Sequence, residues 1–165
     1  HKGLNGGTNP EQYNINLNNN SAEVDWAGAW ADVAPTATHW TVGNDNAGNG
    51  TYNYIACLFA SISGISKVGY YTGNGSSTER TITLGFQPRF IMVRNTDTAS
   101  DWEFLDTVRG WSSGSDDQRL WLNLTNAQDT GLNDIGGPTS TGFTITESHA
   151  HWNADGDNYI YYAHA

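Results

Sequence analysis

The chain has 165 residues and a formal net charge of −10, with 7 lysines and arginines against 17 aspartates and glutamates. This charge repels a phosphate backbone, so a nucleic-acid partner is not expected. No apolar run approaches the length of a membrane span, so membrane insertion is not expected either. The 19 glycines and the short aromatic and β-branched runs between them are typical of a turn-rich β protein.

The first 60 residues combine one helical pattern with short strand patterns. In residues 21–30, apolar side chains recur at helical spacing, which predicts a short helix or a wide loop. Trp40 and Val42 alternate with polar neighbours, which predicts a strand. Cys57, the single cysteine, lies in the apolar run 53–60 and is expected to be a small core residue, and no disulfide framework exists.

The remainder of the chain predicts about seven strands, against three in the first 60 residues. Residues 61–66 are the candidate joint; they are too apolar for a disordered linker, so the two parts are expected to pack together. Residues 73–76 predict a tight hairpin between strands at 68–71 and 81–82. Residues 89–94 are apolar on both faces, which predicts a central strand covered on both sides.

The chain also repeats itself about 105 residues apart. Residues 53–60 (NYIACLFA) match 158–165 (NYIYYAHA), and 35–42 match 138–145. Residues 1–60 therefore correspond to the C-terminal part of a first repeat unit, and 61–165 to a complete second unit. We predict an all-β fold, a duplicated antiparallel β-sandwich of jelly-roll-like type with an incomplete first repeat. The pairs expected to superimpose are Leu17 with Leu122, Trp40 with Phe143, and Tyr54 with Tyr159.

Six motifs of the second unit form an ordered set: 71–76, 85–94, 106–110, 122–127, 141–143 and 153–160. This set resembles a β-rich module of virion structural and tail-fibre proteins of tailed bacteriophages, especially marine and cyanobacterial phages. The resemblance covers the whole second unit and, in its latter part, residues 1–60. It implies a virion structural protein on the particle surface, with other virion chains as partners and no catalytic residues to carry over.

The resemblance leaves the role on the particle open. A tail-fibre or tail-associated adhesin that contacts a host-surface glycan is the expected function. A capsid decoration module and a cellular carbohydrate-binding domain are the alternatives. No counterpart of 71–76 or 85–94 is found in residues 1–60, so the first unit has strand edges without partners. We expect either a homo-oligomer or further upstream sequence to complete it.

Four tryptophans are the candidate residues for glycan or partner binding. Trp111 and Trp152 lie in loops beside polar and glycine residues. An exposed indole offers a flat face to a sugar or to an interface. The alternative is that each folds back onto its own sandwich. Trp26 and Trp30 are expected to cap an interface with a neighbouring chain.

Metal binding has two weak candidates, and no other cofactor is expected. Asn153, Asp155 and Asp157 place oxygen ligands at alternate positions, as in half of a calcium loop. An ordinary turn explains the same pattern. His149 and His151 could face the same side of a strand as metal ligands, but no third ligand occurs at a recognised spacing.

Catalysis has one candidate pair, and we expect no enzyme activity. Asp101 and Glu103 would lie on one side of a strand, about 7 Å apart, as the carboxylates of a glycosidase do. The alternative is a solvated polar face of an amphipathic strand, because aromatic residues separate the two acids. Asp106 and Arg109 predict a structural ion pair or turn network.

Overall fold

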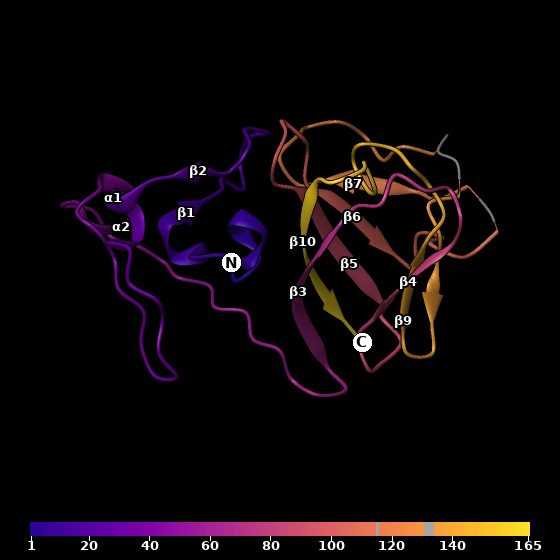
Figure 1. The fold of residues 1–165 in the computed structure, drawn as a ribbon, viewed down its shortest axis with the longest axis horizontal. Helices are drawn as coiled ribbons and strands as arrows, with labels where there is room; N and C mark the ends of the chain where they lie inside the picture. The colour runs from indigo at the N-terminus through magenta and orange to yellow at the C-terminus, as the bar shows by residue number, and fades with distance from the viewer. Residues whose placement is uncertain (115, 131–133) are drawn as a thin grey trace.

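The computed structural model describes residues 1–114, 116–130 and 134–165. Two antiparallel sheets form a sandwich from residues 66–165, and residues 1–65, the N-terminal segment, lie beside it (Figure 1). Mostly β structure in antiparallel sheets confirms the predicted all-β, sandwich-like fold. In the described residues the helices are short turns, listed as Leu4–Gly7 (η1), Pro10–Gln12 (η2), Ala27–Trp30 (α1) and Asn46–Asn49 (α2). None of them is long and apolar enough to cross a membrane.

The larger sheet has five strands in the order β3-β10-β5-β6-β7. Their bounds are Ser66–Thr72 (β3), Phe90–Asn95 (β5), Glu103–Asp106 (β6), Arg119–Trp121 (β7) and Asn158–His164 (β10). β10 is paired along both edges, with Tyr159 opposite Tyr71 on one side and Asn95 on the other. Because both ladders are antiparallel, β10 has partners for its backbone N–H and C=O groups on both sides.

The smaller sheet has three strands in the order β4-β9-β8. Their bounds are Arg80–Thr83 (β4), Pro138–Thr139 (β8) and Gly142–Ile145 (β9). Two further strands, Tyr13–Asn14 (β1) and Val24–Asp25 (β2), pair only with each other within the N-terminal segment. The described part of the sandwich thus has eight strands, one more than the sequence predicts.

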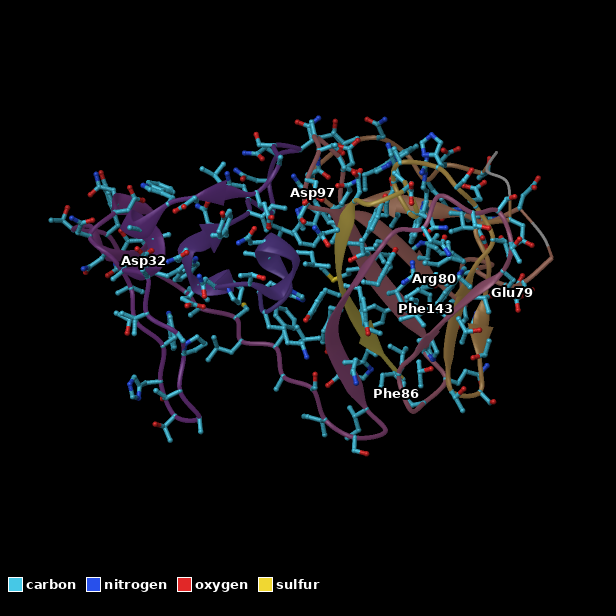
Figure 2. All side chains as sticks on the ribbon, viewed as in Figure 1. Asp32, Glu79, Arg80, Phe86, Asp97 and Phe143 are labelled. Atoms are coloured by element: carbon cyan, nitrogen blue, oxygen red, sulfur yellow. The ribbon has the colours of Figure 1, made fainter. Side chains whose placement is uncertain are left out.

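The core lies between the two sheets and is rich in aromatic rings. Tyr71 stacks on Tyr159 at a centroid distance of 5.0 Å, and Phe143 meets Tyr161 edge to face at 5.7 Å. Phe143 comes from the smaller sheet and lies inside the sandwich near Arg80 of β4 (Figure 2). Burial raises the pKa of Tyr159 and of Tyr161 to about 12. The Phe143–Tyr161 contact joins the two sheets directly, as a sandwich core requires, whereas Tyr71 and Tyr159 are neighbours within the larger sheet.

Trp111 and Trp152 belong to this core and are only 2% and 1% exposed. Trp111 meets Phe143 edge to face at 6.2 Å, and the Trp152 carbonyl oxygen accepts a hydrogen bond from the Tyr71 hydroxyl at 2.8 Å. The alternative that both indoles fold back onto the sandwich is therefore confirmed. The expectation that they offer exposed stacking faces is wrong, because the loops that hold them turn inward.

Arg94 of β5 fastens the N-terminal segment to the outer face of the larger sheet. Its buried guanidinium donates hydrogen bonds to three backbone carbonyl oxygens, those of Asn16 at 3.1 Å, Asn19 at 2.6 Å and Ser21. The indole N–H of Trp102 donates to the same Asn16 oxygen at 2.9 Å. The prediction of a central strand covered on both sides is confirmed, since β5 faces the core on one side and this segment on the other.

The predicted hairpin at residues 73–76 is wrong. β3 and β4 belong to different sheets, so the loop between them crosses from one sheet to the other. Its backbone pairs with the loop that precedes β10: Gly73 N–H donates to the Asp157 oxygen at 2.7 Å, and Gly75 N–H to the Asn153 oxygen at 2.9 Å. The local Gly-Asn-Gly sequence is thus a turn, but its partner is distant in sequence.

The expected superposition of the two repeats is not found. Phe143 lies in β9 and is 1% exposed, whereas Trp40 lies outside any strand and is 42% exposed. Tyr159 is buried in β10, whereas Tyr54 is exposed in a segment without strand pairing. Cys57, expected in the core, is also exposed. The physical reason is that residues 1–60 contain no counterpart of β3 and β5, the two strands that flank β10.

The predicted helix in residues 21–30 forms only at its end. α1 is a single turn that follows Trp26, and Ser21 is not its N-cap. The Ser21 carbonyl oxygen instead accepts a hydrogen bond from the Arg94 guanidinium, and the Glu23 backbone N–H donates to the Thr96 carbonyl oxygen at 2.8 Å. The start of the predicted helix is therefore extended along the sandwich, because tertiary contacts outweigh the weak helical pattern.

Replacing Arg94 with methionine is expected to release the N-terminal segment while the sandwich stays folded. The change removes three charge-assisted hydrogen bonds, a loss of roughly 3 kcal/mol. Two backbone amides report on this contact, those of Glu23 and of Ser100, which donates to the Asn20 oxygen. Hydrogen exchange of these amides should become about a hundredfold faster. Arg89→Met, at an exposed arginine, is the control, and equal protection in both variants would contradict the role of Arg94.

Asp117 should make the stability of the fold fall as pH rises between about 4 and 6. Its buried carboxylate accepts hydrogen bonds from the backbone N–H of Ser112 and Ile135, and burial raises its pKa from 3.8 to about 6. Between these two pH values the native state keeps the Asp117 proton, whereas the unfolded chain has lost it. Deprotonation of the native carboxyl group therefore lowers the free energy of unfolding by up to about 3 kcal/mol. Urea unfolding from pH 3.5 to 7.5 should show this fall in the wild type but not in Asp117→Asn. The same slope in both proteins would refute the assignment.

Candidate functional site

A pocket of about 330 Å³ opens in the N-terminal segment. We call it the tryptophan pocket; it is lined by Lys2, Glu11, Trp30, Val33, Pro35 and Trp40. Figure 2 labels Asp32, which lies between the pocket residues Trp30 and Val33 in the sequence. Of the four tryptophans expected to bind a ligand or partner, Trp30 therefore contributes to a pocket. Trp26 is also exposed but does not line it.

The indoles of Trp30 and Trp40 are positioned by backbone contacts between α1 and Gly43. Trp30 is the last residue of α1, and Gly43, three residues after Trp40, donates its N–H to the Ala29 carbonyl oxygen at 2.7 Å. A Cβ atom on Gly43 would lie 2.0 Å from the Gly28 oxygen, so only glycine permits this close approach. The residues between Trp30 and Gly43 form a loop whose two ends are thereby held together.

A turn closes the outer end of this loop. The backbone N–H of Thr36 donates to the His39 carbonyl oxygen at 2.8 Å, and the Thr36 hydroxyl lies 2.9 Å from His39 Nδ1. These contacts reverse the chain between Pro35 and Trp40, which puts both residues on the pocket wall. The turn thus brings Trp40 back toward Trp30.

The chemistry of the tryptophan pocket is aromatic with a polar rim. Trp30 and Trp40 are 38% and 42% exposed, so part of each indole is available to a ligand. Lys2 and Glu11 carry opposite charges on the rim, so the pocket has no strong preference for either sign. Indole faces pack against apolar C–H surfaces, and the charged rim offers both donors and acceptors. A sugar ring has both kinds of surface, as has a protein side chain with a polar tip.

The candidate calcium residues take part in the hydrogen bonds of a turn. Asn153 is buried, and its amide donates to Asn74 Oδ1 at 2.7 Å and to the Ser76 carbonyl oxygen at 2.9 Å. Asp157 accepts a hydrogen bond from the Asn95 amide at 2.8 Å, whereas Asp155 is exposed. Among the described residues, no group of three His, Cys, Asp or Glu side chains could hold a metal ion.

Glu103 is the centre of a buried polar network. Both of its carboxylate oxygens lie 3.2 Å from Arg119 Nη1, and one of them also accepts from the Trp121 indole N–H at 3.2 Å. The same oxygen lies 2.6 Å from His151 Nδ1. The alternative that this carboxylate is on a solvated face is therefore wrong, because Glu103 points into the sandwich. Its charge is compensated by an arginine, as a buried carboxylate requires.

The other polar candidates have structural partners of their own. Asp101 precedes β6 and accepts a hydrogen bond from the Asn123 amide at 2.7 Å, so it belongs to a different network from Glu103. Asp106 accepts hydrogen bonds from two backbone amides of the following turn and forms an ion pair with Arg109. The predicted structural role of Asp106 and Arg109 is confirmed.

His149 and His151 lie together, but they belong to no group of three described side chains that could hold a metal ion. Their ring centroids are 4.9 Å apart in an edge-to-face arrangement. His149 Nδ1 accepts a hydrogen bond from the His151 backbone N–H at 3.3 Å, and His151 Nδ1 faces Glu103. In both rings the Nδ1 atom therefore already has a partner within the protein.

Comparison with known proteins assigns the chain to a family. The chain belongs to the family described as Domain of unknown function (DUF7483), whose model matches residues 1–165. The match covers both the sandwich and the N-terminal segment with its tryptophan pocket. No curated protein and no solved structure matches the chain.

Sequence reasoning missed Trp40 as a pocket residue. The alternation of Trp40 and Val42 with polar neighbours predicted an inward-facing strand position. The signal that could have found the pocket is the pair of Pro35 and Gly43 around the segment, which marks the ends of a loop. Trp30 precedes that loop, and Trp40 lies within it, ten residues later.

Replacing Gly43 with alanine is expected to disturb the tryptophan pocket and leave the sandwich intact. The added Cβ would clash with the Gly28 carbonyl oxygen, and backbone cannot give way as a flexible side chain does. The solvent exposure of Trp30 and Trp40, followed by quenching of tryptophan fluorescence, should change. Gly48→Ala is the matched control, because its Cβ would meet only ordinary contacts with Val42. An identical quenching profile for both variants would contradict the role of Gly43.

Proposed function

We propose that this chain is a non-catalytic structural and binding module of a bacteriophage particle. Its role is that of a tail-fibre or tail-associated adhesin, which contacts a host-surface glycan through the tryptophan pocket. One observation carries the proposal: two half-exposed indoles, Trp30 and Trp40, line the same pocket. The ordered motifs of residues 61–165, which resemble those of phage virion proteins, support the location on a virion surface.

The pocket suits weak binding repeated over many copies. Its lining offers two aromatic side chains and a few polar groups. A particle that displays many copies multiplies such weak contacts, because each later contact forms at high effective concentration. The net charge of −10 also favours an uncharged saccharide over an acidic one.

Trp30→Ala and Trp40→Ala are each expected to weaken binding to host cells and to their purified surface polysaccharide at least about tenfold. A loss of this size corresponds to about 1.4 kcal/mol of lost stacking contact. Binding can be measured by titration of labelled protein onto cells. Tyr52→Ala is the matched control, because Tyr52 is an exposed aromatic residue outside the pocket. Unchanged binding in both tryptophan variants would rule out the pocket as the contact site.

The position of the protein on purified particles separates the adhesin from its alternatives. Immunogold labelling is expected at the tail. Labelling confined to the capsid would replace the adhesin with a capsid decoration module. A protein that binds saccharide but is missing from particles would be a cellular carbohydrate-binding domain.

The proposal also excludes turnover of the glycan. Glu103 is buried against an arginine, and Asp101 belongs to a separate network, so the two carboxylates do not form a shared site. Incubation with host polysaccharide should release no oligosaccharide. Release that is lost in Asp101→Asn or Glu103→Gln would overturn this part of the proposal.

A second role, assembly with other virion chains or with further copies of this chain, is supported by residues 53–60. Ile55 is 95% exposed, and Leu58 and Phe59 are exposed beside it. This run has the sequence pattern of β10, but it lies outside any strand. An extended, apolar and unpaired backbone invites strand pairing by another chain. We propose that this run is the contact through which the protein forms an oligomer.

The double variant Ile55→Lys, Leu58→Lys is expected to reduce self-association by preventing burial of this run. The wild type should sediment as an oligomer at micromolar concentration, and the variant should shift toward monomer by at least about tenfold in dissociation constant. Val108→Lys is the control, because Val108 is an exposed apolar residue of the sandwich. A wild type that remains a monomer would exclude self-assembly through this run.

A further inference from the structure

A second cavity, the inter-sheet cleft, opens at the β7 edge of the sandwich and is independent of the tryptophan pocket. It encloses about 480 Å³, within the size range of small-molecule sites. The residues that decide its chemistry are Arg119, Thr146, Glu147, Ser148, His149 and Trp152. Arg119 belongs to β7 of the larger sheet, and Thr146 directly follows β9 of the smaller sheet. The cleft therefore lies where the apolar core between the sheets ends.

Two buried N–H donors of the cleft residues have no hydrogen-bond partner. They are Trp152 Nε1, on a side chain that is 1% exposed, and Arg119 Nε. Buried donors are almost always paired in folded proteins, because an unpaired donor loses its hydration without compensation. Two such donors, on two residues that line the same cavity, point to a ligand that brings hydrogen-bond acceptors.

An anionic ligand is disfavoured, although Arg119 lines the cleft. The Arg119 guanidinium already faces both carboxylate oxygens of Glu103 at 3.2 Å and a carboxylate oxygen of Asp129 at 3.4 Å. A third carboxylate, that of Glu147, stands on the cleft wall. The positive charge is therefore compensated, and a phosphate or carboxylate would meet net negative charge.

The remaining wall groups suit hydroxyl groups on a ligand. Ser148 and Thr146 carry hydroxyls, Glu147 offers acceptor oxygens and His149 an imidazole. The Thr146 hydroxyl donates to the Asp134 carbonyl oxygen at 2.7 Å, which leaves its lone pairs free to accept. The residues that line the cleft thus offer both donors and acceptors, and a hydroxyl group both donates and accepts.

We infer that the inter-sheet cleft is a second binding site of this domain, for an uncharged, hydroxyl-rich ligand the size of one or two sugar units. The ligand enters across the loop between β9 and β10, where Ser148 and His149 are exposed. Trp152 Nε1 and Arg119 Nε are covered in this structure, so their pairing with ligand oxygens requires the covering groups to shift. The inference does not depend on binding at the tryptophan pocket.

Nitrogen-15 NMR of the full chain tests the site, because it observes both donors directly. The probes are glucose, galactose, N-acetylglucosamine and their common disaccharides, with glucuronate as the anionic comparator. The indole signal of Trp152, assigned with Trp152→Phe, and the Nε–H signal of Arg119 are expected to shift and saturate with at least one neutral probe. Glucuronate is expected to bind at least tenfold more weakly. Tighter binding of glucuronate, or no shift with any probe at 100 mM, would overturn the inference.

Two variants connect these shifts to the cleft. Ser148→Trp should fill the cleft from its exposed rim and weaken binding at least tenfold, and His149→Ala tests the same wall without added bulk. Thr107→Trp, at an exposed position outside the cleft, is the matched control and should bind like the wild type. The Trp30→Ala, Trp40→Ala double variant should keep the Trp152 shift while host-cell binding falls. Loss of the Trp152 shift in that double variant, or its persistence in Ser148→Trp, would refute a separate site in the cleft.

Discussion

Backbone pairing along both edges of β10 is the constraint on which the rest of the structure depends. Tyr159, Tyr161 and Ala163 become core residues because β3 and β5 occupy the two edges of this strand. Residues 53–60 have nearly the same apolar pattern but no flanking strands, and they remain exposed. An apolar sequence is therefore necessary for a core strand but not sufficient, since each backbone N–H and C=O also needs a partner.

The sequence was informative where the pattern is local and strong. Residues 89–94 are apolar on both faces, and β5 is indeed covered on both sides. The hairpin predicted at 73–76 is wrong because a glycine-rich turn shows that the chain reverses, not which strand it joins. The partner of that loop lies about 80 residues later, around Asn153 and Asp157. Contacts at such separations depend on the whole topology, which no short window of sequence contains.

For the candidate sites, too, the sequence indicates the chemistry of a residue but not its position in the fold. Trp111 and Trp152 have polar neighbours in sequence, yet both are core residues, because loops can fold back over the end of a sandwich. Glu103 alternates with aromatic residues as a solvated side chain would, yet it is buried with Arg119 and His151. Residue type showed that these positions matter. Only the fold shows whether they face solvent, a cavity or one another.

Arg94 holds the N-terminal segment by main-chain oxygens alone, those of Asn16, Asn19 and Ser21. Every amino acid carries the same carbonyl group, so this attachment does not depend on the side chains of the segment. Pocket residues other than His1, whose ring lies 3.3 Å from the Tyr161 carbonyl oxygen, can therefore change without loss of the hydrogen bonds that Arg94 makes.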